Sequence, residues 1–185
     1  MKNLKILFAT LLALLAFSGC SPTQSVVNLE PYNTKATSKT SYKDVYIANI
    51  HDNRKNKSVV ATITDSKGSV KEYVMLQNDL ASWFNEALTT ELKANGANVG
   101  NLSGVVAEIY INEFSANMSG FASDNTRGNI KILLKIQKGE TTITKNISNE
   151  QTKFELIPAG NAFKTLLRDM INDAVKRVAI QILNS

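Results

Sequence analysis

The chain has 185 residues, 43% of them hydrophobic, with a single cysteine and a formal net charge of +5. This length is enough for one modest domain, and so small a charge gives no argument for nucleic-acid binding. One cysteine allows no disulfide within the chain, so the fold must depend on its own hydrophobic core. No apolar stretch reaches the roughly 18 residues that a membrane-spanning helix requires.

The first twenty residues have the composition of a secretory signal. Lys2 and Lys5 precede a nearly unbroken apolar run, Ile6–Phe17, and two small residues then lead to Cys20. Charge, apolar core and small residues in this order are typical of a cleaved signal peptide. We therefore predict a signal peptide over residues 1–19. Its removal lowers the net charge from +5 to +3, because Lys2 and Lys5 are lost with it.

The end of this segment resembles the lipobox of bacterial lipoproteins, whose cysteine receives lipid and becomes the first mature residue. The resemblance implies that Cys20 is lipidated, with palmitate among its acyl chains, and that it anchors the protein in a membrane. More than one chain makes such anchoring stable, at about 0.8 kcal/mol per buried methylene. A secreted protein without lipid, in which Cys20 is incidental, is the alternative. Ser21 stands where an Asp would signal retention at the inner membrane of enteric bacteria, which favours the outer membrane and a domain facing the periplasm.

Residues 20–41 are predicted to be the lipidated cysteine and a flexible tether. The segment is rich in Ser, Thr, Asn and Pro, a composition that favours linkers. About 20 flexible residues span on the order of 25 Å r.m.s.. The only apolar cluster is Val26–Leu29, and its packing as an edge strand is the alternative. Residues 42–185 then form a single domain.

The domain is predicted to open with strands and a helix. Short β-branched and aromatic runs separated by polar turns favour strands. The expected order is a strand at Val45–Ile50, a polar loop at His51–Lys57, and a hairpin of Val59–Thr64 and Ser69–Leu76 around Asp65–Gly68. A helix follows, because apolar residues recur at four-residue spacing from Leu80 to Leu92. Asn78 or Asp79 can cap it, and Gly96 can end it.

The second half predicts three strands and a long helix. Apolar and polar residues alternate in Val105–Ile111 and in Ile130–Ile136, whereas Thr142–Thr152 has few apolar residues. The three strands are expected to form an antiparallel meander with a more polar last strand. Ser115–Gly128, between the first two, is predicted to be a long polar connection. Helical spacing of apolar residues predicts the final helix over Asn161–Leu183.

This order of elements predicts the fold class. Strands and two amphipathic helices in one short domain favour an α+β two-layer sandwich, a mostly antiparallel sheet with both helices packed on one face. The opposite face of the sheet must then be solvated or meet a partner.

Residues for catalysis or metal binding are few. His51 is the only histidine and lies beside Asp52 in the predicted polar loop, with no nucleophile that the sequence places nearby. One histidine and a lipidated cysteine leave only scattered carboxylates as metal ligands. We therefore expect no catalytic residue, no metal and no cofactor, and we expect the protein not to be an enzyme. A cell-wall hydrolase that uses His51 is the least favoured class.

Two places could bind a partner. Met118 and Phe121 are apolar residues in the predicted polar connection, and exposed apolar side chains on a long loop can form a docking site. Phe121 tucked onto the edge of the domain is the alternative. Tyr110 and Leu133 fall on the solvent side of neighbouring predicted strands and could form a patch, with Leu133 flanked by lysines; a scattered surface residue is the alternative there.

The chain resembles the YajG-type family of uncharacterised bacterial lipoproteins. The resemblance is carried by Cys20 and by the segments Asn78–Val99, Val105–Gly120 and Gly128–Lys138 before a long final helix. It implies a cell-envelope lipoprotein and offers no active-site residues. The favoured function is a membrane-anchored, non-enzymatic periplasmic domain that binds another envelope protein, without nucleic acid. A small-ligand or lipid carrier, as an auxiliary component of envelope transport, is the alternative.

Overall fold

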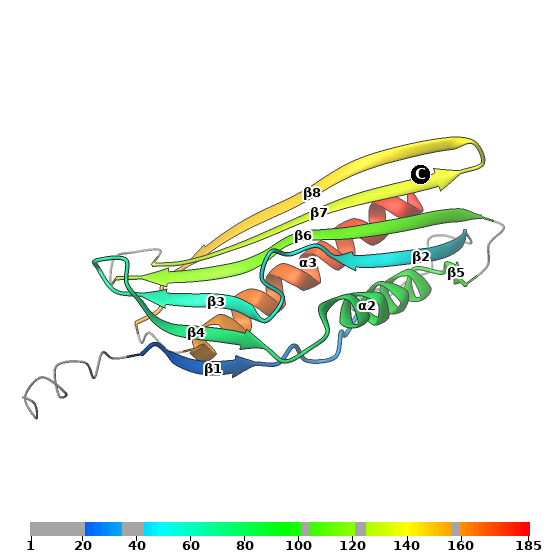
Figure 1. The fold of residues 1–185 in the computed structure, drawn as a ribbon. Helices are drawn as coiled ribbons and strands as arrows, with labels where there is room; N and C mark the ends of the chain where they lie inside the picture. Colours follow the sequence, from blue (N-terminus) through cyan, green and yellow to red (C-terminus); the bar gives the residue numbers. More distant parts are fainter. Residues whose placement is uncertain (1–20, 35–42, 101–103, 121–124, 157–159) are drawn as a thin grey trace, which may run out of the picture.

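Strand β6 (Val105–Ser119) is the central strand of the sheet, and it is long enough to pair with two strands placed end to end along one side (Figure 1). The structure is a computed structural model and describes residues 21–34, 43–100, 104–120, 125–156 and 160–185. The other elements are, in chain order, β1 (Thr23–Val27), β2 (Asp44–Asp52), β3 (Val59–Thr64), β4 (Val70–Leu76), α2 (Leu80–Ala94), β5 (Asn98–Val99), β7 (Thr126–Lys138), β8 (Thr141–Lys153), the short 3-10 helix η1 (Gly160–Ala162) and α3 (Phe163–Leu183).

The sheet is mixed, and its two longest pairings are antiparallel. One side of β6 pairs with β7, which pairs with β8, and both pairings are antiparallel. The other side of β6 pairs in parallel with two strands placed end to end, β2 along residues 105–111 and β3 along 116–119. β3 forms a hairpin with β4, and β1 pairs in parallel with β4. The predicted meander and hairpin are confirmed.

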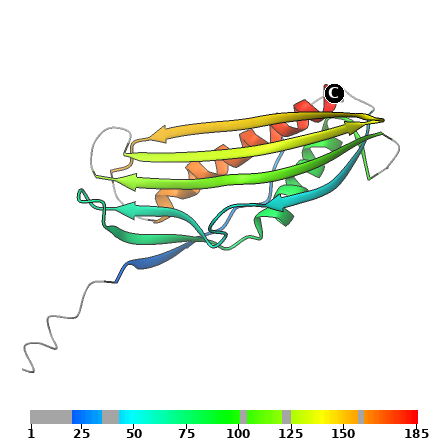
Figure 2. The same ribbon diagram turned by 45° about the horizontal axis from the view of Figure 1, so that its top comes forward.

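Both helices cover the same face of the sheet, which confirms the two-layer α+β fold (Figures 1 and 2). α2 packs on β2 and β5, and α3 crosses β6, β7 and β8. Phe84 and Leu88 of α2, Ile109 of β6 and Leu167 of α3 are fully buried in the layer between them. Complete burial of one such side chain contributes about 1.5–3 kcal/mol. This apolar layer is therefore the main stabilising feature of the domain.

Helix α2 begins and ends at the residues that the sequence favours. Asp79 is its N-cap, and the side-chain oxygen Oδ1 accepts a hydrogen bond from the backbone N–H of Ser82 at 2.8 Å. After the C-cap Asn95, Gly96 adopts a φ of 90°, which favours glycine, and the Gly96 N–H donates to the carbonyl of Lys93. Local capping residues therefore define this helix independently of the rest of the fold.

The N-terminal part of the predicted tether is folded. β1 pairs with β4 over five residues, and Val27 and Leu29 are each only 3% exposed. The prediction of a flexible tether over residues 20–41 is therefore wrong for residues 23–34, and the alternative of an edge strand near Val26–Leu29 is closer to the structure. A five-residue edge strand with mostly polar residues has too few alternating positions to give a strand signal. Residues 35–41 and Cys20 lie outside the described residues.

Residues 28–34 continue from β1 along α2, and we call residues 23–34 the N-terminal strap. The indole Nε1 of Trp83 donates to the carbonyl of Glu30 at 3.0 Å. The Tyr32 hydroxyl donates to Glu91 Oε2 at 2.7 Å, and the Thr34 hydroxyl donates to the same oxygen at 2.6 Å. Glu91 is 7% exposed. A buried carboxylate of α2 therefore holds the end of the strap.

The predicted polar connection over Ser115–Gly128 is mostly strand, which corrects the expectation of a loop. β6 continues to Ser119 and β7 begins at Thr126. Gly128 faces α3, and a Cβ atom added there would lie 2.8 Å from Sδ of Met170. Small residues stand at this end of the sheet because α3 approaches closely. Most residues of this segment are small for that reason, and their small size does not indicate solvent exposure.

Candidate functional site

The face of the sheet opposite the helices, which we call the open face, carries cross-strand ion pairs. Lys131 Nζ lies 2.7 Å from Glu113 Oε2, and Arg127 Nε lies 3.2 Å from Glu150 Oε1. The hydrogen-bonded Glu113 carboxylate raises the pKa of Lys131. Such exposed pairs contribute little to stability, because solvent and salt screen the attraction between their charges. They leave this part of the face close to neutral.

A cluster of four side chains lies on this face at β2, β6 and β7, and we call it the Tyr110 patch. The rings of His51 and Tyr110 stack with centroids 4.7 Å apart and planes at 14°. Lys135 Nζ lies 4.9 Å from the centroid of the Tyr110 ring, within cation–π range. Leu133 is the cross-strand partner of Tyr110 in the register of β6 and β7. All four side chains are half-buried.

The patch has polar surroundings that fix its orientation. The Tyr110 hydroxyl donates to Glu108 Oε2 at 2.9 Å, so the ring is held from its polar end as well as by stacking. Beside it lies an open-face hollow of about 250 Å³ lined by Val106, Glu108, Lys135, Gln137 and Thr142. An aromatic ring next to a hollow, with one acidic and one basic side chain in the lining, suits contact with a side chain of another protein.

The structure places the residues predicted for partner binding in different surroundings. It brings Tyr110 and Leu133 together, as the alternation of their strands indicated. Met118 is fully buried in β6, so the prediction of Met118 as an exposed docking residue is wrong. Its side chain lies on the helix-facing side of β6. The segment looks polar in the sequence because the residues next to Met118 are small and polar. Phe121 and Cys20 lie outside the described residues.

His51 and Lys135 are the members of the patch that sequence reasoning missed. His51 is in β2, which runs to Asp52, so the prediction that residues 51–57 form a loop is wrong for these two residues. His51 pairs with Tyr110 because β2 runs parallel to β6, and parallel pairing of these distant strands left no signal in the sequence. Lys135 stands two residues from Leu133 on the same strand, and this spacing could have identified it.

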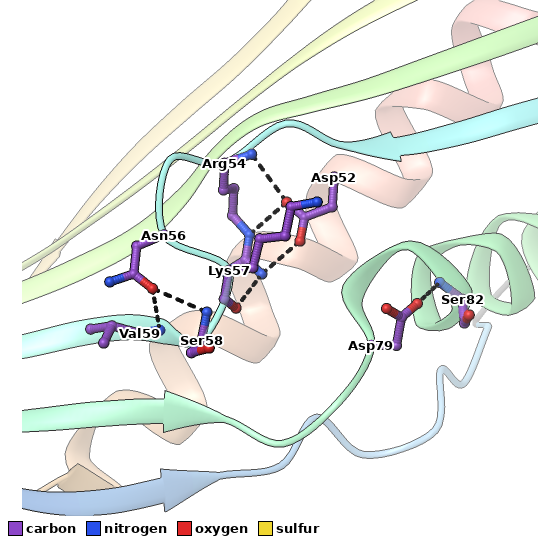
Figure 3. A network of polar contacts seen from close by, with 8 residues as sticks. All are labelled: Asp52, Arg54, Asn56, Lys57, Ser58, Val59, Asp79 and Ser82. Atoms are coloured by element: carbon purple, nitrogen blue, oxygen red, sulfur yellow. Dashed lines mark hydrogen bonds and ion pairs between the residues drawn. The ribbon is translucent and has the colours of Figure 1, made fainter.

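A second polar cluster lies on the other side of β2 (Figure 3). Arg54 Nε and Nη2 donate to the two carboxylate oxygens of Asp52 at 2.9 and 2.8 Å, and Nη2 also donates to the carbonyl of Lys57 at 2.8 Å. The side chains of Arg54 and Asp52 are only 4% and 11% exposed. This buried pair closes the turn between β2 and β3 and so keeps the two strands in line along β6.

Asp79 at the start of α2 adjoins this cluster. A hollow of about 350 Å³ is lined by residues of both segments, among them Asp52, Arg54, Lys57 and Asp79. The hydrogen bond from the Ser82 N–H, with smaller effects of Lys57 and Arg54, holds the pKa of Asp79 below its usual range. Two carboxylates balance two cations in this hollow, so its charge selects neither anions nor cations.

Within the parts of the chain that the structure describes, no group of three or more His, Cys, Asp or Glu side chains could hold a metal ion. In the same residues, no helix is sufficiently long and apolar to cross a membrane. In the described part of the chain, the Tyr110 patch and the hollows around the sheet are candidate places for recognition.

Comparisons with known proteins place the chain in a family. A search of the curated proteins gives no match. A family model described as an uncharacterized lipoprotein matches residues 33–185. A solved structure of an uncharacterized protein is similar to the chain with a TM-score of 0.59 and 10% identity, covering 86% of this chain and 99% of that one. A protein from Xanthomonas campestris has a TM-score of 0.58 and 9% identity, covering 88% of this chain and 95% of that one.

A minor lipoprotein from Acinetobacter baumannii is a more distant neighbour, with a TM-score of 0.45, 13% identity and coverage of 77% and 94%. The first two structures show that this fold is shared by proteins of very different sequence. The family match spans residues 33–185, which is most of the domain, and confirms the resemblance to uncharacterised bacterial lipoproteins of the YajG type. The chain belongs to this family of uncharacterized lipoproteins.

Proposed function

We propose that this envelope lipoprotein is anchored through lipid on Cys20 and that its domain binds another envelope protein through the Tyr110 patch. The family supports a lipoprotein of the cell envelope. We further propose that residues 1–19 are cleaved and that Cys20 carries palmitate. The domain then lies in the periplasm, and the anchor is in the outer membrane, which Ser21 favours. The proposal gives the domain no catalytic role.

The observation that carries the proposal is the Tyr110 patch itself. Tyrosine is enriched at protein interfaces because it offers a large rigid ring with a polar end. Here the ring is already stacked on His51 and hydrogen-bonded to Glu108, so little conformational freedom is left to lose on binding. Leu133 adds apolar area beside it. The surrounding ion pairs leave a nearly neutral surface, which suits a protein partner better than a strongly charged polymer.

Photocrosslinking in intact cells tests this role of the open face. A photoreactive amino acid replaces Leu133 in the full-length protein, and Ile180, which is 52% exposed on α3, serves as the matched position on the helical side. We expect a discrete crosslinked species from position 133 and none from position 180. The same species should disappear in the Tyr110→Ala background. Equal crosslinking from both positions, or a product unaffected by Tyr110→Ala, would contradict the proposal.

Anchoring is tested separately by the Cys20→Ala variant. Lipidated protein partitions into the detergent phase and the membrane fraction, and Cys20→Ala should leave both. If the Cys20→Ala protein stays in the detergent phase, the proposed anchor is wrong.

The carrier alternative is favoured by one observation. An apolar hollow of about 370 Å³ lies at the end of β3 and β6, lined by Ile63, Thr64, Lys71 and Met118 among others, and its size is within the range of small-molecule sites. Native mass spectrometry of the purified protein tests it: a co-purifying small molecule that the Ile63→Trp variant no longer retains would support a carrier. A measured mass equal to that of the protein without a bound small molecule would count against the carrier function.

A further inference from the structure

We propose that the end of the domain at which β1 begins rests on the bilayer surface, with Phe154 and Leu156 inserted among the lipid headgroups. This inference rests on the proposed anchoring through Cys20. It adds a second contact with the membrane, made by the folded domain itself, and so it fixes how the open face is presented.

Only a short length of chain separates the proposed lipid anchor from the fold. β1 starts at Thr23, so only Ser21 and Pro22 separate it from Cys20. Three residue steps span at most roughly 10 Å when fully extended. β1 is fixed in the sheet by its pairing with β4, and the Ser25 hydroxyl donates to Glu72. The start of β1 therefore stays within about 10 Å of the lipidated residue.

Several segments of the chain meet at the end of the domain where β1 begins. The β3–β4 turn and the end of β8 lie at the same end of the sheet as the start of β1 (Figures 1 and 2), although β1 and β8 form opposite edges of the sheet. Gly160 of η1 packs against Ser25 of β1. Leu156 precedes Gly160 by four residues, which span at most roughly 14 Å. Leu156 therefore lies within roughly 14 Å of the glycine that contacts β1.

Large apolar side chains are exposed at this end of the domain. Leu156 is 75% exposed and Phe154 is 46% exposed, and they are two of only four large apolar side chains that are exposed among the described residues. They stand two residues apart in one segment that follows β8. Large exposed apolar side chains grouped at one end of a domain mark a contact surface, and the short spacer brings this end to the headgroup region.

The charges at this end indicate that the contact does not depend on anionic lipid. Lys153 pairs with Glu155 at 2.7 Å, and Lys71 pairs with Asp65 at 3.1 Å. Lys67 at the tip of the β3–β4 turn is the cation left without an ion pair in the described part of this end. One cation adds little to membrane binding compared with the clusters of 4–8 that define polybasic sites. We therefore expect insertion into zwitterionic as well as anionic bilayers.

The test uses the full-length lipidated protein, whose Cys20 thiol is acylated. An environment-sensitive fluorophore is attached through Leu156→Cys, and a matched protein carries it through Ile180→Cys near the opposite end of the domain. Each is reconstituted into phosphatidylcholine vesicles and into vesicles containing phosphatidylglycerol, and detergent-phase partition is checked first. We expect blue-shifted emission and quenching by spin-labelled lipid for the Leu156→Cys protein in both vesicles, and water-like emission for the Ile180→Cys protein.

The outcomes separate this inference from the proposed function. If the protein partitions with detergent but the Leu156→Cys probe remains water-like, the membrane contact is wrong and the anchor stands. If the protein does not partition with detergent, the anchor and this inference are both wrong. Phe154→Ser in the labelled protein should reduce the lipid quenching, and unchanged quenching would contradict the part assigned to Phe154. A blue shift and lipid quenching seen only in vesicles containing phosphatidylglycerol would contradict the proposal that the contact is apolar.

Discussion

The strap gives a sharp test of how the structure is held together, through the single change Tyr32→Phe. This substitution keeps the ring, which makes an edge-on contact with Trp83 at a centroid distance of 6.4 Å, and removes only the hydroxyl. The hydroxyl donates to the buried carboxylate of Glu91. Glu91 keeps donors from Thr34 and from the Asn95 side chain after the change, so the carboxylate is not left without partners.

The expected cost follows from these contacts. Hydrogen bonds to charged groups contribute about 1.5–3 kcal/mol, and the remaining donors to Glu91 put this one at the lower end, about 1.5 kcal/mol. For a domain of this size, about 1.5 kcal/mol lowers the Tm by about 3–6 °C. Urea denaturation at pH 7 measures the free energy of unfolding directly.

The pH dependence gives an independent signature. Burial, together with the hydrogen bond and the charge of Glu91, raises the pKa of Tyr32 above its ordinary value. As the pH rises above about 10, tyrosine in the unfolded chain loses its proton while Tyr32 in the folded chain keeps it. The folded state then binds more protons, so the free energy of unfolding falls as the pH rises further. Tyr32→Phe should lack this part of the alkaline loss.

Tyr73→Phe is the matched control. Tyr73 is also half-buried, and its hydroxyl makes no hydrogen bond within the described residues. We expect its removal to change the free energy of unfolding by less than about 0.5 kcal/mol. If Tyr32→Phe and Tyr73→Phe have the same effect at pH 7, or the same alkaline profile, the reasoning about the strap is wrong.

Three further changes test other parts of the fold by urea denaturation. Asp79→Ala should cost about 1 kcal/mol through loss of the N-cap; because the folded pKa of Asp79 is lowered, this difference should be complete above about pH 4 and fade as the pH falls through that pKa. Asp52→Ala should cost about 3–5 kcal/mol by leaving Arg54 buried without its partner, and the Asp52→Ala/Arg54→Met double variant should recover much of this loss. Met118→Ala should cost about 2–5 kcal/mol, as for a core residue; a change below about 0.5 kcal/mol would favour the loop that the sequence suggested.

The elements that the sequence predicted well are those specified by local residues. α2 has a cap, a four-residue apolar spacing and a terminal glycine, all within one short segment. Tyr110 and Leu133 could be grouped in advance because alternation along each strand assigns its residues to one face or the other. Alternation within a strand does not indicate which other strand pairs with it. The parallel pairing that brings His51 to Tyr110 joins segments about sixty residues apart, and only the assembled sheet determines it.

The errors have a common physical origin, which is that polarity was taken as exposure. Gly128 is small because α3 passes over it, and β1 is polar because it is a strand at the edge of the sheet. At Gly128 the sequence reflects the small space beneath α3, and at β1 it reflects the solvent beside an edge strand. Local composition alone does not reveal either cause, and it therefore predicts that both segments lack regular secondary structure.

The unpaired edge of strand β8 affects how neighbouring copies of an anchored protein can associate. It is thirteen residues long and pairs with β7 alone among the described strands, so one whole side of its backbone is unpaired. Proteins fastened to a membrane meet one another far more often than they would in free solution, and a bare edge of this length invites sheet-to-sheet adhesion. The strand is almost entirely Thr, Asn, Ser, Gln, Lys and Glu, with only Ile143 and Ile147 apolar. Lys145, Glu150 and Lys153 place charged side chains along this edge, and such charges hinder edge-to-edge pairing between neighbouring copies.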